Sequence, residues 1–328
     1  MSKAILHIGT HKTGTSSLQD AFFMHRMSLQ HYGIIYPQVG NISGHHALAA
    51  NWITLPAEFN IPGGLENWQR TFQQLADADL TLFISSEELS RAHPDRVDMP
   101  TLASLVSSFD EVQVVCTLRH QVDLVESSLS EALKKTESPV SLAQFMETAL
   151  AEHLADGIFL DYNDLYDHLL TGFEPGGITF LSYEQACSQA NGVIGAYLDM
   201  LDSDLPDSLV NQMASFRSNT SVPALHLWTA ASVATSLPPD TAEVAAVTNW
   251  LGSRFGDNCT SSLLTATEHE DLVKTFTPLN RRFEARVAEY QPGFSLASPP
   301  NREVDVDRNE ISEDLLDQLR GQLESTTG

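Results

Sequence analysis

The chain has 328 residues, of which 42% are apolar, and a formal net charge of −25. This length and composition fit one α/β domain with helical additions and a substantial core. The acidic balance argues against general nucleic-acid binding, which needs a basic face. No apolar run approaches the length that spans a membrane, and the N-terminus lacks a signal-peptide pattern, so we expect a cytoplasmic protein. The three cysteines lack the spacing of metal or redox motifs.

The first forty residues predict a strand, a loop, a helix and a second strand. Residues 4–8 are apolar, too few and too rich in β-formers for a helix, so we expect a buried strand that ends at Gly9. Apolar residues then recur at helical spacing up to Gly33, which is a plausible stop for a helix. Residues 33–37 are typical of a second, short strand.

The rest of the chain alternates between strands and helices and then becomes mainly helical. Residues 38–64 indicate a long loop. Strands are expected at 81–86, 111–118 and 177–183, and helices at 65–76, 99–108, 121–135, 141–155, 161–171, 192–202, 223–236, 240–254 and 268–290. Strands that alternate with helices predict a parallel sheet with right-handed crossovers, whose ligands lie beyond the carboxyl ends of the strands.

We therefore expect an α/β fold with a P-loop-type parallel β-sheet flanked by helices and a largely helical C-terminal half. A single domain is expected over 1–298, with the sheet core in about 1–190 and helical additions in about 191–298. Residues 299–328 are expected to form an acidic C-terminal tail with one possible amphipathic helix near 310–323.

Gly9 and Gly14 bound a short loop with Lys12 between them, after the first strand and before the first helix. A strand, a glycine-bounded loop and a helix direct backbone N–H groups and a helix N-terminus at an anionic group. Three hydroxyl donors follow in the first turn of the helix: Thr15, Ser16 and Ser17. The pattern predicts a phosphate site.

The loop departs from the nucleoside-triphosphate pattern G-x-x-x-x-G-K-[ST], because Thr15 occupies the lysine position and the lysine has moved to Lys12. Residues 11–17 read His-Lys-Thr-Gly-Thr-Ser-Ser. They resemble the 5′-phosphosulfate loop of sulfotransferases, P-K-[ST]-G-T-[TS], with His11 where Pro is frequent.

A second stretch resembles the 3′-phosphate motif of the same family. Arg119 follows the expected strand 111–118, and Ser127 lies eight positions later inside the next helix. The family's motif begins R-[DN]-P and carries Ser at this spacing, whereas His120 and Gln121 follow the arginine here. Arginine supplies a planar fork for phosphate oxygens, and serine adds a short hydroxyl donor. Because both motifs occur in the family's order, the chain resembles the sulfotransferase superfamily, in particular bacterial members.

This resemblance implies that 3′-phosphoadenosine-5′-phosphosulfate (PAPS) is the donor, with adenosine 3′,5′-bisphosphate as its product. The acceptor would be an alcohol, phenol or amine. Transfer of the sulfuryl group depends on positioning and charge stabilisation, and no metal is expected. Lys12 would contact the bridging oxygen and the departing phosphate.

The residues expected to bind the cofactor fall into two groups. The first lies in the loop and the first helical turn: His11, Lys12, Thr13, Gly14, Thr15, Ser16 and Ser17. The second would hold the 3′-phosphate and consists of Arg119 and Ser127. The family's late R-K-G-x-x-G segment is absent here, and Arg217 is the residue expected to substitute for it, together with Asn219.

An acceptor hydroxyl needs a general base. Glu87 is the first candidate, because it follows the expected strand 81–86, about where carbohydrate sulfotransferases with a glutamate base carry theirs. His46, and after it His45, lie in the loop that would frame the acceptor, although a structural role is the alternative for both. Glu88 could replace Glu87 only if the strand ended earlier.

Two other functions stay open. A P-loop kinase or NTPase needs a lysine after Gly14, where this chain has Thr15, and an acidic Mg²⁺ ligand, which Glu87 could supply. A non-catalytic nucleotide-binding descendant of the fold is the second, although Lys12 and Arg119 argue against it. By family analogy we expect a saccharide or small metabolite as acceptor. Neither a nucleic acid nor a membrane is an expected partner, and the oligomeric state is left open.

Overall fold

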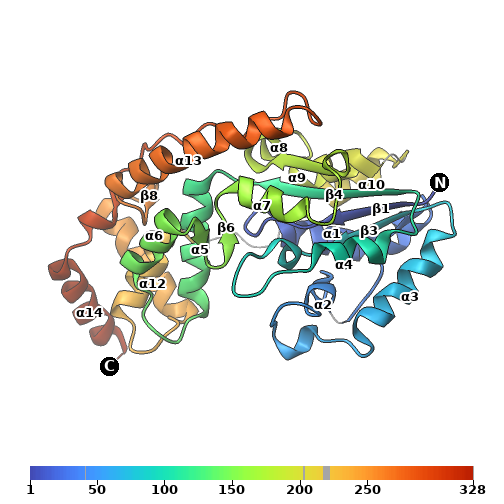
Figure 1. Cartoon of the computed structure of the whole chain (residues 1–328). Coiled ribbons are helices and arrows are strands. Elements are labelled where there is room, and N and C mark those ends of the chain that lie inside the picture. Colours follow the sequence, from blue (N-terminus) through green and yellow to red (C-terminus); the bar gives the residue numbers. More distant parts are fainter. Residues whose placement is uncertain (41, 202–203, 217–221, 328) are drawn as a thin grey trace. The chain divides into compact units, whose positions relative to one another are not determined.

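The computed structural model describes residues 1–40, 42–201, 204–216 and 222–327 (Figure 1). The chain divides into two compact units. The first comprises Met1–His120, Gly157–Asn219 and Leu279–Ser298, and the second Gln121–Asp156, Thr220–Pro278 and Pro299–Gly328. The expected single domain over 1–298 and separate tail stay predictions.

The first unit is built on a five-stranded parallel sheet in the order β2-β3-β1-β4-β7 (Figure 1). Its strands are β1 (Lys3–His7), β2 (Ile34–Ile35), β3 (Thr81–Ser85), β4 (Glu111–Leu118) and β7 (Ile178–Ser182). Lys3 of β1 pairs with Thr81 on one side and Glu111 on the other. Because all strands run the same way, their carboxyl ends share one edge of the sheet. The expected α/β fold with a parallel sheet is confirmed.

Helices cover this sheet because its strands are apolar on both faces. Ile5, Phe83 and Val115, on three adjacent strands, pack with residues of α1, α9 and α10 in one buried cluster. The helices of the first unit are α1 (Thr15–Gln30), α2 (His46–Ala49), α3 (Gly64–Ala76), α4 (Met99–Val106), α7 (Tyr162–Leu169), α8 (Tyr183–Ser188), α9 (Gly192–Leu198) and α10 (Asp207–Ala214), with the short strand β6 (Ile158–Phe159). Short 3₁₀ turns lie at Ala57–Phe59, Glu87–Ser90, Pro175–Gly177 and Asp199–Leu201.

The second unit is mainly helical. Its helix α11 (Ala224–Val233) contacts α5 (Gln121–Lys135), α12 (Thr241–Phe255) and α14 (Glu313–Thr327). Its other elements are α6 (Leu142–Ala151), β5 (Leu154–Ala155), β8 (Ser261–Ser262), β9 (Val306–Asp307) and a 3₁₀ turn at Arg308–Glu310. The helix α13 (Ala266–Val287) begins in this unit and ends in the first. The largely helical C-terminal half is thus confirmed.

Described residues of the segment 299–323 contribute to the core of the second unit. Val306 is buried and pairs with Ser261 in a short parallel ladder. The predicted amphipathic helix near 310–323 is α14, whose apolar side chains Leu315, Leu316 and Leu319 are buried. Hydrophobic burial therefore outweighs the acidic composition of this segment.

Several short elements carried no sequence signal. Strands of two residues, such as β8 and β9, are too short to show a period of two. The expected helix 141–155 is shorter than predicted and ends at Ala151. His153 and Asp156 follow with φ angles of 55° and 51°, a left-handed conformation that a right-handed helix cannot contain.

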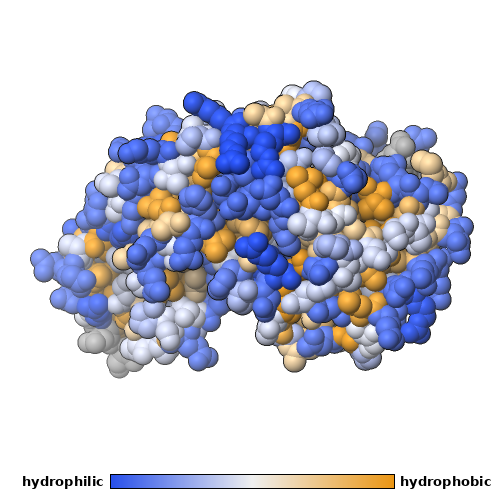
Figure 2. Space-filling model, viewed as in Figure 1, coloured by the Kyte–Doolittle hydropathy of each residue, from blue (hydrophilic) through white to orange (hydrophobic). Residues whose placement is uncertain are grey.

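Figure 2 shows hydrophilic side chains over much of the face in view, with apolar side chains in small patches among them. Among the described residues, no helix combines the length and the apolar character that crossing a bilayer requires.

Candidate functional site

The loop between β1 and α1 depends on two glycines in the left-handed region. Gly9 has a φ of 91°, and a Cβ there would lie 2.8 Å from Cβ of Glu87. Gly14, with a φ of 79°, is the N-cap of α1, which begins at Thr15. Glycine is needed at position 9 both for its φ angle and because the loop passes against the end of β3.

Backbone and hydroxyl groups hold this loop against β4. The N–H of Thr10 donates to the carbonyl of Thr117 over 2.7 Å, and the N–H of Thr117 donates to the carbonyl of Gly9. The hydroxyl of Thr13 donates to the carbonyl of Thr10 over 2.6 Å, and both threonines are buried. The predicted contact of Thr13 with a ligand is therefore limited to its backbone.

The N-terminus of α1 has the properties of an anion site. Gly14 makes no side-chain cap, and no acidic residue lies in the first turn. The N–H groups of a first turn need partners and carry the positive end of the helix dipole. Ser16 is exposed and Ser17 is half-buried beside these groups. An anion bound at this end of the helix would meet N–H donors and hydroxyls together.

Lys12 and Arg119 lie at the same place in the site. Lys12 has a φ of 64°, and Nη1 of Arg119 donates to its carbonyl oxygen over 3.0 Å. The Arg119 guanidinium lies 5.1 Å from the centre of the Tyr183 ring, and the hydroxyl of Tyr162 donates to the Arg119 carbonyl. Within the described chain, Nε of Arg119 is buried and makes no hydrogen bond. The structure thus brings together the arginine that follows β4 and the lysine of the loop.

Glu87 lies directly beside the first turns of α1. The hydroxyl of Thr15 donates to Oε1 over 3.0 Å, and Nε2 of Gln19 donates to Oε2 over 2.7 Å. Burial opposes ionisation of Glu87, but the nearby His46 and His11 and the bond from Gln19 outweigh it and hold its pKa below the ordinary value. The Thr15 hydroxyl, which we expected to face the cofactor, is thus directed to Glu87, because a nearly buried carboxylate requires donors.

His46 completes the group around Glu87. Its Nδ1 lies 2.8 Å from the hydroxyl oxygen of Ser86 and 3.9 Å from Oε2 of Glu87. The side chains of His46 and Glu87 are each 14% exposed. Both can therefore be reached from solvent while the protein fixes their orientation.

His45 is structural. The N–H of Ser85 donates to its Nδ1 over 3.0 Å, and its Nε2 donates to the carbonyl of Pro37 over 2.7 Å. Burial lowers the pKa of His45 to about 4 despite these bonds. Since both ring nitrogens are engaged inside the protein, His45 has no atom left to accept a proton from a substrate.

The remaining predicted residues are Ser127, Arg217, Asn219 and Glu88. Ser127 lies on α5, which belongs to the second unit, so its pairing with Arg119 stays a prediction. Arg217 lies outside the described residues, as does Asn219. Glu88 contacts Arg91 and His11 rather than the atoms around Glu87.

The sequence analysis missed Gln19 and Arg91 and gave Tyr183 no role in the site. Gln19 follows Thr15 by four residues, and this spacing places both on one face of a helix. Tyr183 directly follows β7, so the rule that ligands lie beyond strand ends would have pointed to it. Arg91 carried no such signal, because it lies in an irregular segment after a 3₁₀ turn.

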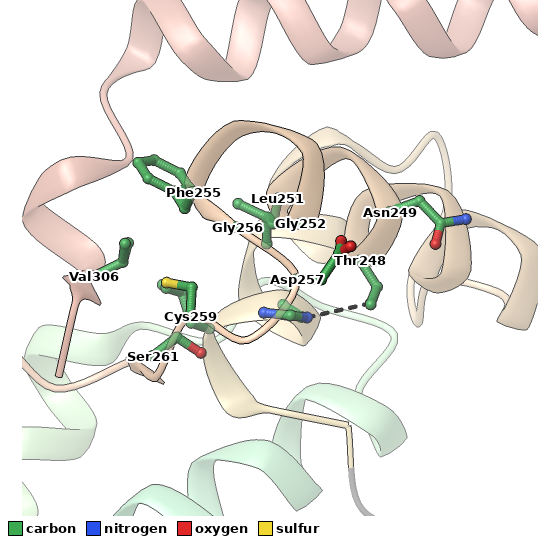
Figure 3. A pocket seen from close by; sticks show the side chains of 12 residues that line it. Thr248, Asn249, Leu251, Gly252, Phe255, Gly256, Asp257, Cys259, Ser261 and Val306 are labelled. Atoms are coloured by element: carbon green, nitrogen blue, oxygen red, sulfur yellow. Dashed lines mark hydrogen bonds between the residues drawn. The ribbon is translucent and has the colours of Figure 1, made fainter.

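A separate cavity of about 120 Å³ lies in the second unit, beside α11, α12 and the segment that follows α12 (Figure 3). Thr248, Asp257 and Cys259 contribute to its wall, and Nδ1 of His226 lies 3.2 Å from the hydroxyl oxygen of Thr248. None of the predicted site residues is among the described residues that line it. We assign this cavity no part in phosphate chemistry.

We predict that Gly9→Ala is far more damaging than Gly33→Ala. Both glycines have positive φ angles, but a Cβ at position 33 would meet no atom within 4 Å. Gly33→Ala should lower the free energy of unfolding by about 1 kcal/mol from backbone strain alone, whereas the added clash should raise the cost of Gly9→Ala to about 3 kcal/mol. Urea unfolding measures both values, and equal losses would show that the approach to Glu87 carries no constraint.

We predict that His45 makes the protein less stable as the pH falls from 6.5 to 5. The unfolded chain takes up a proton at His45 near its ordinary pKa of 6.5, whereas the folded chain does so only near pH 4. The free energy of unfolding should therefore fall by about 1.5 kcal/mol over this interval because of His45. The pH dependence of urea unfolding should be correspondingly weaker in His45→Gln, and an unchanged slope would contradict the buried, neutral ring.

Comparisons with known proteins find similar solved structures at low sequence identity. No family model and no curated protein matches the sequence. The structure is similar to that of a sulfotransferase from Alicyclobacillus acidocaldarius, at 14% identity and a TM-score of 0.45, over 86% of this chain and 94% of that one. It is also similar to mouse sulfotransferase SULT7A1 complexed with PAP, at 16% identity and a TM-score of 0.41, over 88% and 89%. The solved structures that resemble this chain thus include sulfotransferases, the family its phosphate loop resembles.

Proposed function

We propose that this protein is a sulfotransferase that takes a sulfuryl group from PAPS. The observation that carries the proposal is the placement of Lys12. It lies in a loop closed by Gly9 and Gly14, its carbonyl accepts a hydrogen bond from Arg119, and the N-terminus of α1 follows. The Arg119 guanidinium at the end of β4 is thereby bound to the main chain of Lys12, and a cationic residue at each of these two places suits a donor with a 5′- and a 3′-phosphate.

The residues present fit such a donor. The left-handed Gly14 and the first turn of α1, which lacks a side-chain cap, supply N–H donors for a 5′-phosphate, with Ser16 and Ser17 beside them. Arg119, whose buried Nε makes no hydrogen bond among the described residues, is the candidate for the 3′-phosphate, and Ser127 and Arg217 are its proposed helpers. The donor, when bound, supplies the sulfuryl group.

Lys12 is proposed to stabilise the negative charge that develops on the departing phosphate. A positive charge placed in advance needs little rearrangement as the negative charge grows, and this is the usual source of such stabilisation. Its left-handed backbone conformation is unusual for a residue other than glycine and is typical of functional sites.

Glu87 is proposed as the general base that takes the proton of an acceptor hydroxyl, with His46 as the second candidate. The donors Thr15 and Gln19 fix the Glu87 carboxylate, and its lowered pKa keeps it ionised. Each carboxylate oxygen can accept more than one hydrogen bond, so both retain capacity for the acceptor. We propose a hydroxyl or amine of a saccharide or small metabolite as the acceptor.

One observation favours a kinase or NTPase as a second candidate. The hydroxyl of Thr15 and the carboxylate of Glu87 lie together between a phosphate loop and the end of a strand. In P-loop NTPases a hydroxyl of the loop and a carboxylate hold Mg²⁺, and there the hydroxyl follows the lysine, at the position of Ser16 in this chain. The absence of a lysine after Gly14 counts against this candidate, and nucleotide binding separates the two.

We predict that adenosine 3′,5′-bisphosphate stabilises the protein and that adenosine 5′-monophosphate and ATP–Mg²⁺ do so far less. At 100 times its dissociation constant, the bisphosphate should raise the free energy of unfolding by about 2.7 kcal/mol, visible as a rise in the melting temperature. Arg119→Ala should abolish the rise, whereas Arg70→Ala, which removes an exposed cation of α3, should preserve it. Stabilisation by ATP–Mg²⁺ alone would favour the kinase. Binding of the bisphosphate with unchanged turnover in Lys12→Ala would refute the role of Lys12.

We predict that Glu87→Gln lowers kcat by about 10²–10⁴-fold, the usual contribution of a general base, and leaves the affinity for the bisphosphate largely unchanged. The amide keeps the shape of the carboxylate but cannot take the proton. His46→Gln should cost less, because the histidine contacts Glu87 only at 3.9 Å. Steady-state kinetics that follow the formation of the sulfated acceptor measure kcat in both variants. A larger loss of kcat in His46→Gln than in Glu87→Gln would make His46 the base.

A further inference from the structure

His11, Glu88 and Arg91 form a compact charged network on the β3 side of the phosphate loop. Oε1 of Glu88 lies 3.3 Å from Nε2 of His11, and Oε2 accepts a bond of 2.6 Å from Nε of Arg91. Nη2 of Arg91 lies 3.2 Å from Nε2 of His11. The three side chains are only 13%, 15% and 21% exposed, respectively. A charged network of this burial is sensitive to the loss of any member.

The ring of His11 is held at one end. Within the described residues its Nδ1 is buried and makes no hydrogen bond, so the contacts with Glu88 and Arg91 reach it through Nε2. Burial opposes ionisation of Glu88, but the bonds from His11 and Arg91 outweigh it and keep the pKa of Glu88 well below its ordinary value. Glu88 is therefore ionised near neutral pH and forms an ion pair with Arg91.

Arg91 is itself fixed in the first unit. Its backbone pairs with Ile158 of β6 in an antiparallel bridge, and the next residue, Ala92, donates from its N–H to the carbonyl of Gly157 over 2.8 Å. A Cβ at Gly157 would lie 2.3 Å from the carbonyl oxygen of His93 and 3.2 Å from Nη1 of Arg91. Only glycine permits this close approach, so Arg91 and Glu88 stand on a rigid support.

The residue next to His11 is Lys12, whose φ of 64° is rare for a side chain other than glycine. From the β4 side, Arg119 binds the carbonyl oxygen of Lys12 over 3.0 Å. From the β3 side, the Glu88–Arg91 ion pair packs against His11, whose Nε2 lies 3.3 Å from Oε1 of Glu88 and 3.2 Å from Nη2 of Arg91. A conformation of this kind persists only where its surroundings determine it from more than one direction.

We infer that Glu88 and Arg91, acting through His11, are positioning residues that hold Lys12 in the orientation that the transfer reaction requires. This inference rests on the proposed function for the role of Lys12. Glu88 then has a different role from the adjacent Glu87: one carboxylate orients the cation of the loop, and the other takes the proton of the acceptor. The assignment also explains why Glu88 contacts His11 and Arg91 instead of sharing the donors of Glu87.

The test compares the wild type with Glu88→Gln, His11→Ala and His11→Gln. Glu111→Gln is the matched control, because Glu111 pairs with Lys3 over 2.8 Å at the amino-terminal ends of the strands of the same sheet, whereas Glu88 follows a carboxyl end. Amide hydrogen exchange over residues 9–14, measured without any ligand, reports how strongly the protein restrains the loop. Kinetics and binding of adenosine 3′,5′-bisphosphate report the consequence for Lys12, and the melting temperature of each variant monitors folding.

We expect exchange over residues 9–14 to rise about tenfold in Glu88→Gln and His11→Ala, and to stay at the wild-type rate in Glu111→Gln. In the first two variants kcat should fall by about tenfold to a hundredfold, with a smaller change in KM for the acceptor, as expected when a catalytic group is misplaced. His11→Gln, which keeps a side-chain N–H donor, should recover part of the lost kcat. A role in stability alone would not lower kcat more strongly than it changes KM.

Unchanged exchange over residues 9–14 in Glu88→Gln would overturn the inference, as would an equal rise in Glu111→Gln. Faster exchange in Glu88→Gln but not in Glu111→Gln would show that Glu88 restrains the loop. This result does not depend on whether the wild type binds the bisphosphate. A wild type that fails to bind the bisphosphate would refute the proposed donor. The two failures are therefore separate: one appears in the exchange of the free protein, and the other in ligand binding.

Discussion

The close approach of the Gly9 backbone to Glu87 is the contact on which the candidate site depends. A side chain at position 9 would lie 2.8 Å from Cβ of Glu87, so the loop can reach the end of β3 only because residue 9 is glycine. This approach puts the Glu87 carboxylate beside the first turns of α1, where Thr15 and Gln19 donate to it. Glu87 thereby contacts the loop through its Cβ and the first turns of α1 through its carboxylate.

Charge balance is the second constraint. Two adjacent carboxylates, Glu87 and Glu88, border a loop that we propose binds anionic groups, in a chain with a net charge of −25. Left without partners they would repel a phosphate, since charges interact strongly in a partly buried site. Hydrogen bonds from Thr15 and Gln19 stabilise the charge of Glu87, and the ion pair with Arg91 offsets that of Glu88. The site thus keeps the contacts that the two carboxylates make, while their repulsion of a bound phosphate is reduced.

The sequence was most informative where one local pattern settles the structure. The apolar run before Gly9 and the helical spacing after Gly14 were enough to predict the strand, the loop and the helix, and the buried strand before Arg119 was equally clear. It was least informative where a side chain has several available partners. Thr15 was expected to face a phosphate and instead donates to Glu87. His45 was weighed as a base, although its two nitrogens bind Ser85 and Pro37.

By itself, the sequence determined the α/β fold and the position of the loop between Gly9 and Gly14, and it supplied the two cations that we propose meet the donor. These features follow from apolar periodicity, glycine placement and the rule that parallel strands end at one edge. Only the tertiary structure decided that Glu87 binds the first turns of α1, that Glu88 instead reaches His11 and Arg91, and that Arg119 binds the Lys12 carbonyl. Each of these contacts joins strand ends or loops in which neighbouring residues face different partners. Spacing along the chain cannot predict such a choice, because it is made by burial and by the donors that happen to lie within reach.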